Sequence, residues 1–81
     1  MTYKIELSKT ALKFLKRQPK NQQVRILKAI YKLPEGDIKK LVGGIDEYRL
    51  RVGDYRIIYK MKNEVLTILV LDIGNRGQIY K

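Results

Sequence analysis

The chain has 81 residues, of which 44% are hydrophobic and 32% are charged. This is the size of one small globular domain, so we expect a single domain over residues 1–81 with a thin core. The chain contains no cysteine and no histidine. That composition excludes disulfides, the usual zinc sites and any histidine-based catalytic triad, and we expect neither a metal nor a cofactor.

Positive charge dominates the composition. Eighteen Lys and Arg residues stand against eight Asp and Glu residues, which gives a formal net charge of +10. Such a field suits nucleic acid, an anionic membrane or an acidic protein, although a merely solvated surface is the alternative. No stretch approaches the ~20 apolar residues of a membrane span, and no signal peptide follows Met1. We therefore expect a cytoplasmic protein without a membrane partner.

The N-terminal half predicts one strand and a helix hairpin. In residues 2–7 the alternation places Tyr3, Ile5 and Leu7 on one face, as in a half-buried strand. Ser8 is a candidate N-cap for a first helix, and Pro19 either ends that helix or opens the next. A second helix is predicted over Asn21–Leu33, before Pro34 and Gly36. The residues assigned to the buried faces of the two helices are Ala11, Leu12, Phe14 and Leu15, and then Val24, Ile26, Leu27, Ile30, Tyr31 and Leu33.

The C-terminal half changes to a period of two. Residues 34–47 read as a connecting segment anchored by Leu41 and Val42, with a sharp turn at Gly43–Gly44. Strands are predicted over 48–52, 55–61 and 65–71, and the last of these is apolar enough to be covered on both faces. The order β-α-α-β-β-β predicts an α+β domain: a mainly antiparallel four-stranded sheet with the helix hairpin packed on one face.

One predicted hairpin gathers positive charge. If Gly53–Asp54 is a two-residue turn, Arg51 pairs with Arg56 and Arg49 with Ile58. Alternation then separates an apolar face from the arginine face, which we define as Arg49, Arg51, Arg56, Ile58 and Lys60. Directly opposed arginines are unfavourable by a few tenths to ~1 kcal/mol, whereas clustered guanidiniums suit phosphate. The arginine face is therefore a candidate anion site, and an ordinary hydrated sheet face is the alternative.

Two residues near the C-terminus join the candidates. Arg76 lies between Gly74 and Gly77, which let the backbone approach a ligand closely. Tyr80 follows four residues later and could stack on a base, donate to a phosphate or take part in proton transfer. Tyr80 could equally be a hydrophobic plug with an exposed hydroxyl.

These residues resemble the RelE branch of the RelE/ParE toxin superfamily. The resemblance rests on residues 41–44, 48–59 and 73–80 and extends to the first strand and the helix hairpin. It implies the toxin of a type II toxin–antitoxin pair, a ribosome-dependent endoribonuclease that cuts mRNA by metal-free attack of a 2′-hydroxyl on the adjacent phosphate. It also implies a cognate acidic antitoxin as partner. The catalytic positions fall on Arg56, Arg76 and Tyr80, and the RNA phosphate-binding positions on Arg49 and Arg51. Lys60 joins the predicted phosphate-binding residues as a member of the arginine face.

The sequence departs from the best-known RelE pattern in two ways. Some relatives carry lysines where this chain has Arg49 and Arg51, and many have a histidine where it has Asn75. Lysine can lose a proton when its pKa falls, but arginine effectively cannot, so a lysine-as-base mechanism does not transfer. Two alternatives stay open: a ParE-type inhibitor of DNA gyrase, and a catalytically weakened, basic nucleic-acid-binding relative.

Overall fold

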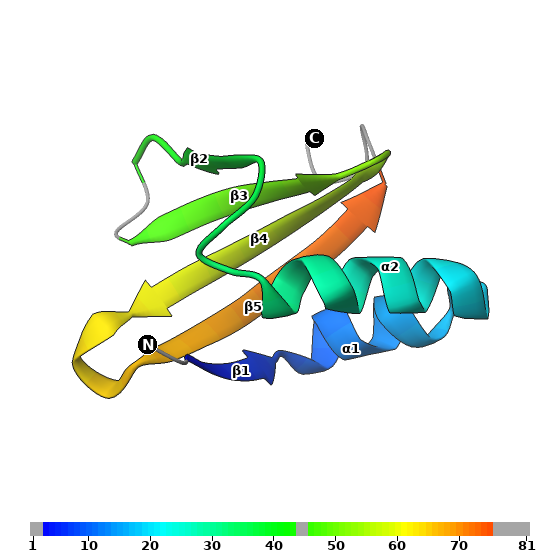
Figure 1. The fold of residues 1–81 in the computed structure, drawn as a ribbon, viewed down its shortest axis with the longest axis horizontal. Coiled ribbons are helices and arrows are strands. Elements are labelled where there is room, and N and C mark those ends of the chain that lie inside the picture. The colour runs from blue at the N-terminus through cyan, green and yellow to red at the C-terminus, as the bar shows by residue number, and fades with distance from the viewer. Residues whose placement is uncertain (1–2, 44–45, 76–81) are drawn as a thin grey trace.

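A five-stranded sheet carries two helices on one face (Figure 1). The computed structural model describes residues 3–43 and 46–75. The strand order is β1-β5-β4-β3-β2, in which β1 (Lys4–Leu7) runs parallel to β5 (Thr67–Asn75). The other pairings are antiparallel and join β5 to β4 (Tyr55–Lys62), β4 to β3 (Glu47–Val52) and β3 to β2 (Ile38–Lys40). The predicted α+β class and mainly antiparallel sheet are confirmed.

The strand β2 was not predicted. It forms within the supposed connecting segment, pairs with Tyr48, Arg49 and Leu50, and makes five strands where the sequence predicted four. Three residues are too few to show a period-two pattern, so hydropathy alone does not reveal it. The prediction that Val42 anchors this segment is wrong, because Val42 is fully exposed. Leu41 is half-buried, and its N–H donates to the Glu47 carbonyl at 3.0 Å.

Ser8 sets the start of the helix α1 (Lys9–Lys16). Its Oγ accepts from the Ala11 N–H at 3.0 Å, which satisfies a free amide of the first helical turn as predicted. The same hydroxyl donates to the Leu71 carbonyl at 2.7 Å, so the cap also ties α1 to β5. The second helix, α2 (Lys20–Tyr31), begins and ends slightly earlier than the predicted Asn21–Leu33. Within the described residues, neither helix is long and apolar enough to cross a membrane.

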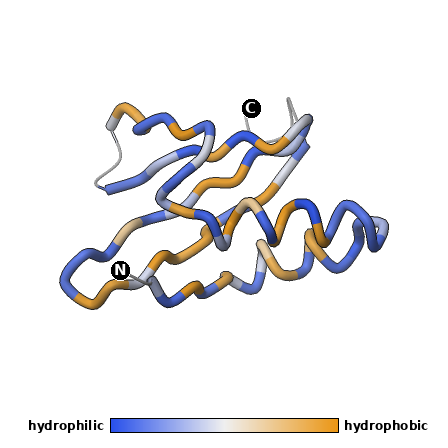
Figure 2. The backbone as a smooth tube through the Cα atoms, in the orientation of Figure 1, coloured by the Kyte–Doolittle hydropathy of each residue, from blue (hydrophilic) through white to orange (hydrophobic). Residues whose placement is uncertain are grey.

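The core lies between the helices and the sheet. Figure 2 shows the apolar stretches of both layers, and the buried residues are Ala11, Leu15, Ile26, Ile30, Leu33, Leu50, Val52, Tyr55, Ile57, Tyr59, Ile68, Val70 and Ile73. Three residues predicted to be buried are exposed: Leu12 at 41%, Val24 at 42% and Tyr31 at 67%. The helix hairpin packs against one sheet only. Each helix therefore buries a single narrow stripe of residues, and the apolar residues beside that stripe face solvent.

The last strand begins later than predicted. Val65 belongs to a short 3₁₀ turn, Asn63–Val65, and Leu66 follows in the left-handed region with φ 47°. From Thr67 onward, Ile68 and Val70 face the helices and are fully buried, whereas Leu69 points to the other face and is half-buried. The prediction that this strand is covered on both faces is therefore wrong. β5 is an interior strand because it pairs with β1 on one side and with β4 on the other.

Candidate nucleic-acid interface

The β3–β4 hairpin has the predicted register. Val52 pairs with Tyr55 and Arg51 with Arg56 across the Gly53–Asp54 turn, and the register continues to the pairing of Arg49 with Ile58. Gly53 has φ 58°, and Asp54 is not among the residues with positive φ, as expected for a type II′ turn. The two-residue connection thereby places three arginines on one side of the sheet.

Helix α2 also supports this turn. A Cβ added at Gly53 would lie 2.7 Å from Nη2 of Arg25, so the Arg25 guanidinium occupies the space beside the glycine. Glycine is required at position 53 for its positive φ, whereas the flexible Arg25 side chain can move aside for a Cβ. This contact links α2 to the end of the hairpin that carries Arg51 and Arg56.

The two faces of the hairpin differ in burial as alternation requires. On the helix side, Leu50, Ile57 and Tyr59 are 1%, 0% and 0% exposed. On the arginine face, Arg51 is exposed, and the remaining members are half-buried: Arg49, Arg56, Ile58 and Lys60. The cations are thus held on the outer side of a sheet whose inner side is packed, an arrangement that limits their movement before a ligand binds.

β2 adds a cation that sequence reasoning missed. Lys39 pairs directly with Arg49, so its exposed side chain extends the arginine face by one strand. In the same transverse row, Ile58 separates Arg49 from Asp72 of β5, whose Oδ1 accepts from the Ile73 N–H at 2.9 Å. Positive charge is therefore concentrated over β2, β3 and β4.

The predicted residues fall into two groups. The first group lies near the hairpin turn: Arg51 and Arg56 are direct cross-strand neighbours, and Arg49 is two residues from Arg51 on the same face of β3. Lys60 pairs with Glu47, four residues along β4 from Arg56 and about 13 Å from it at the strand rise. Lys60 thus lies at the far end of the arginine face. Gly74 is directly opposite Arg56 and is itself buried.

One guanidinium of this face has an unused donor. Nη1 of Arg49 is buried and has no hydrogen-bond partner among the described residues. Neither Arg49 nor Arg51 forms an ion pair with a described carboxylate, whereas Lys4 and Glu6 form an exposed pair at 3.5 Å. A buried donor without an acceptor is unfavourable, and a phosphate oxygen is a suitable acceptor.

A tyrosine stack lies beneath the arginine face. The rings of Tyr48 and Tyr59 are 5.5 Å apart and nearly parallel. Burial, with a smaller contribution from Tyr48, raises the pKa of Tyr59 from 10.0 to about 12. Tyr59 therefore stays neutral at physiological pH and acts as packing for the sheet, not as a proton carrier.

Two of the three predicted catalytic residues, Arg76 and Tyr80, lie outside the described residues. The last described residue, Asn75, pairs with Tyr55 next to the hairpin turn. Arg56 is therefore the catalytic candidate whose position the structure gives. Among the described residues, no group of three or more acidic side chains could hold a metal ion.

Comparisons with known proteins agree with this architecture. A family model described as the ParE toxin of the type II toxin–antitoxin system parDE matches residues 5–80. RelE1 of Methanocaldococcus jannaschii is 30% identical over 88 residues, covering 100% of this chain and 98% of RelE1.

Solved structures of RelE toxins are similar to this chain. The RelE–RelB complex of Pyrococcus horikoshii OT3 contains a chain that is 33% identical with a TM-score of 0.79, covering 96% of this chain and 99% of that one. The isolated RelE toxin of E. coli, at 24% identity, a TM-score of 0.77 and coverage of 96% and 90%, shows the shared fold alone. The chain belongs to the RelE/ParE superfamily and is a toxin of a type II toxin–antitoxin system.

Proposed function

We propose that this toxin is a ribosome-dependent endoribonuclease that cuts mRNA by attack of a 2′-hydroxyl on the adjacent phosphate. The observation that carries the proposal is the direct cross-strand pairing of Arg51 with Arg56, beside Arg49 and Lys39. Opposed cations reduce the stability of a sheet, so their placement on one rigid face suits an anionic ligand. A phosphodiester is such a ligand, and each guanidinium can donate two hydrogen bonds to it.

The reaction needs three contributions. The 2′-hydroxyl loses its proton and its oxygen bonds to phosphorus, the bond to the 5′ oxygen breaks, and that oxygen takes up a proton. The products are a 2′,3′-cyclic phosphate and a free 5′-hydroxyl. Arg56 and Arg76 stabilise the extra negative charge on the phosphate in the transition state. Arg49, Arg51 and Lys60 bind the flanking backbone, and Tyr80 orients the nucleophile or stacks on a base.

The proton acceptor must be something other than the arginine face. Arginine stays protonated in proteins, so Arg49 and Arg51 can position and neutralise phosphate but cannot act as a base. The chain has no histidine to do so. Proton removal then falls to Tyr80 or to a group of the ribosome, which is consistent with dependence on the ribosome.

The test is a reconstituted translation reaction in which mRNA ends are mapped with and without ribosomes. Cuts that occur only on translating ribosomes, and that disappear with Arg56→Gln, are the expected result. Lys9→Gln is the matched control, because Lys9 is an exposed cation in the first turn of α1 and does not belong to the arginine face. Intact mRNA in the presence of folded protein, or equal loss of cutting in both variants, would contradict the proposal.

A second candidate function is inhibition of DNA gyrase. It is favoured by the family model, whose description names the ParE toxin. A supercoiling assay with purified gyrase separates the two, since an endoribonuclease of this kind leaves supercoiling unchanged.

We also propose that an acidic antitoxin neutralises this toxin in the cytoplasm. The P. horikoshii relative was crystallised as a RelE–RelB complex. A net charge of +10 favours association with an acidic protein through complementary fields. The association should therefore weaken as salt concentration rises.

A further inference from the structure

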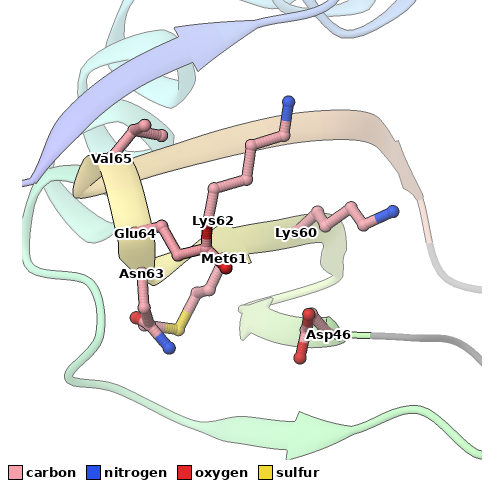
Figure 3. Close-up of a pocket in the computed structure, with 7 residues that line it drawn as sticks. All are labelled: Asp46, Lys60, Met61, Lys62, Asn63, Glu64 and Val65. Atoms are coloured by element: carbon pink, nitrogen blue, oxygen red, sulfur yellow. The ribbon is translucent and has the colours of Figure 1, made fainter.

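A recess opens at the end of the sheet farthest from the Gly53–Asp54 turn. It has a volume of about 550 Å³, within the range of small-ligand sites. Its lining comes from the end of β4, from the 3₁₀ turn and from the residue that precedes β3 (Figure 3). The lining residues are Asp46, Lys60, Met61, Lys62, Asn63, Glu64 and Val65.

The recess is continuous with the arginine face through Lys60. This lysine is the last cation of that face and also lines the recess. Along β4, Lys60 is four residues from Arg56, about 13 Å at the strand rise. The row of Arg49 lies halfway between them. The distance from Arg56 to Lys60 is therefore comparable with the separation of phosphates two nucleotides apart in an extended single strand.

The polar groups of the recess are of a different kind from those of the arginine face. Asp46 and Glu64 contribute carboxylates, and neither side chain makes an ion pair or a hydrogen bond with a described residue. Oδ1 of Asn63 accepts from the Tyr3 hydroxyl at 3.0 Å, which leaves the Asn63 amide NH₂ free to donate. Met61 and Val65 add apolar surface, and the thioether of methionine makes favourable contacts with aromatic rings.

This combination suits a nucleotide better than a phosphate alone. Carboxylates repel phosphate but accept hydrogen bonds from the amino groups on base edges, while Lys60 and Lys62 attract the backbone. Single-stranded RNA is commonly recognised in this way, with a base turned out and bonded along its Watson–Crick edge. Cytosine, adenine and guanine carry an exocyclic amino group, whereas uracil does not.

We propose that the recess binds one nucleotide of the RNA strand that crosses the arginine face, two positions from the cleaved bond, and selects bases that carry an exocyclic amino group. This rests on the proposed function for the presence of the RNA strand. Asp46 and Glu64 accept from the amino group, and Lys60 holds the adjoining phosphate.

A backbone hydrogen bond places Asp46 beside the end of β4. Its carbonyl accepts from the Met61 N–H at 3.1 Å, and its φ is 57°. Asparagine tolerates the left-handed region about as well as aspartate. Asp46→Asn therefore removes the charge without straining the backbone, and Glu64→Gln does the same at an exposed position.

The test is equilibrium binding of 2′-O-methyl RNA heptamers, which lack the attacking hydroxyl and cannot be cleaved. An all-uridine heptamer is compared with heptamers that carry one cytidine, moved through each position. Cytidine differs from uridine mainly in having an amino group at C4. We expect one position at which cytidine tightens binding about tenfold, as for one hydrogen bond to a charged acceptor.

The variants assign that preference to the recess. In the Asp46→Asn, Glu64→Gln double variant the preference for cytidine should vanish or shift toward uridine, because an amide can also donate to a uracil carbonyl. Lys60→Gln should weaken the binding of all heptamers. It should also reduce the magnitude of the negative slope of log affinity against log salt by about 0.7. Glu35→Gln, which removes an exposed carboxylate elsewhere, is the matched control and should keep the preference.

Three outcomes would each overturn the assignment. The preference for cytidine could survive in the double variant, no position could show a preference, or the protein could fail to bind any of the heptamers. Because these ligands cannot be cleaved, the outcome is separable from that of the translation assay. A recess-dependent preference without mRNA cleavage would support the nucleotide site and contradict the proposed catalysis.

Discussion

The substitution Tyr59→Phe tests how the sheet beneath the arginine face is stabilised. The Tyr59 side chain is 0% exposed, and its hydroxyl has no hydrogen-bond partner among the described residues. Burying a hydroxyl without a hydrogen bond costs about 1–3 kcal/mol. Phenylalanine keeps the ring and its stacking on Tyr48 and removes only the oxygen. We therefore expect Tyr59→Phe to raise the free energy of unfolding at neutral pH by about 1 kcal/mol.

The same residue predicts a response to alkaline pH. Burial, and secondarily Tyr48, raises the pKa of Tyr59 from 10.0 to about 12. Between these values the unfolded chain loses a proton that the folded protein keeps, so rising pH favours unfolding. The contribution of Tyr59 is constant below pH 10 and is lost toward pH 12, at up to about 1.4 kcal/mol per pH unit. Tyr59→Phe removes this loss.

Urea denaturation of the wild type and the variant measures both effects. The stability advantage of Tyr59→Phe should grow by about 1 kcal/mol between about pH 8 and about pH 11. The contributions of the other titrating groups to the free energy of unfolding cancel when the two proteins are compared at the same pH. Tyr31→Phe is the matched control, because the Tyr31 side chain is 67% exposed and should show no such difference. A Tyr59→Phe protein less stable than the wild type, or an advantage independent of pH, would refute the reasoning.

Four further substitutions test other parts of the structure by urea denaturation. Arg51→Gln should raise the free energy of unfolding by a few tenths to ~1 kcal/mol by relieving cross-strand repulsion, while weakening RNA binding; lower stability would contradict the repulsion. Ser8→Ala should lower it by ~1–2 kcal/mol, because one hydroxyl caps α1 and bonds to Leu71; an unchanged value would contradict that double role. Ile57→Ala should lower it by ~2–5 kcal/mol, and Leu27→Ala, at a half-buried position, by less; equal losses would contradict the burial difference.

The β3–β4 hairpin was predictable because two independent signals agree there. Gly53–Asp54 suits a two-residue turn, and the flanking residues alternate between apolar and basic. Either signal alone would allow several registers, but a slip of one residue would turn the arginines into the core. The pairing of Arg51 with Arg56 therefore follows from local sequence, and the structure confirms it.

Other features depend on contacts that local sequence does not encode. Lys39 joins the arginine face only because Ile38–Lys40 pairs with β3, and three residues show no usable period. Val24 and Tyr31 have helical spacing but are exposed, since the sheet meets the α2 stripe that contains Ile26 and Ile30. Helical periodicity identifies an apolar face but not which edge of that face the partner layer covers.

The position of the arginines is a consequence of core packing. Leu50 and Ile57 are directly paired and almost fully buried, and they fix the register of the strands that carry Arg49, Arg51 and Arg56. The outer face needs no particular residue for folding, and opposed arginines there reduce stability. A sheet selected for stability alone would carry threonine or opposite charges at these positions. The cluster is therefore best explained by an anionic ligand whose binding offsets the repulsion, with the buried face of the same strands holding the cations in place.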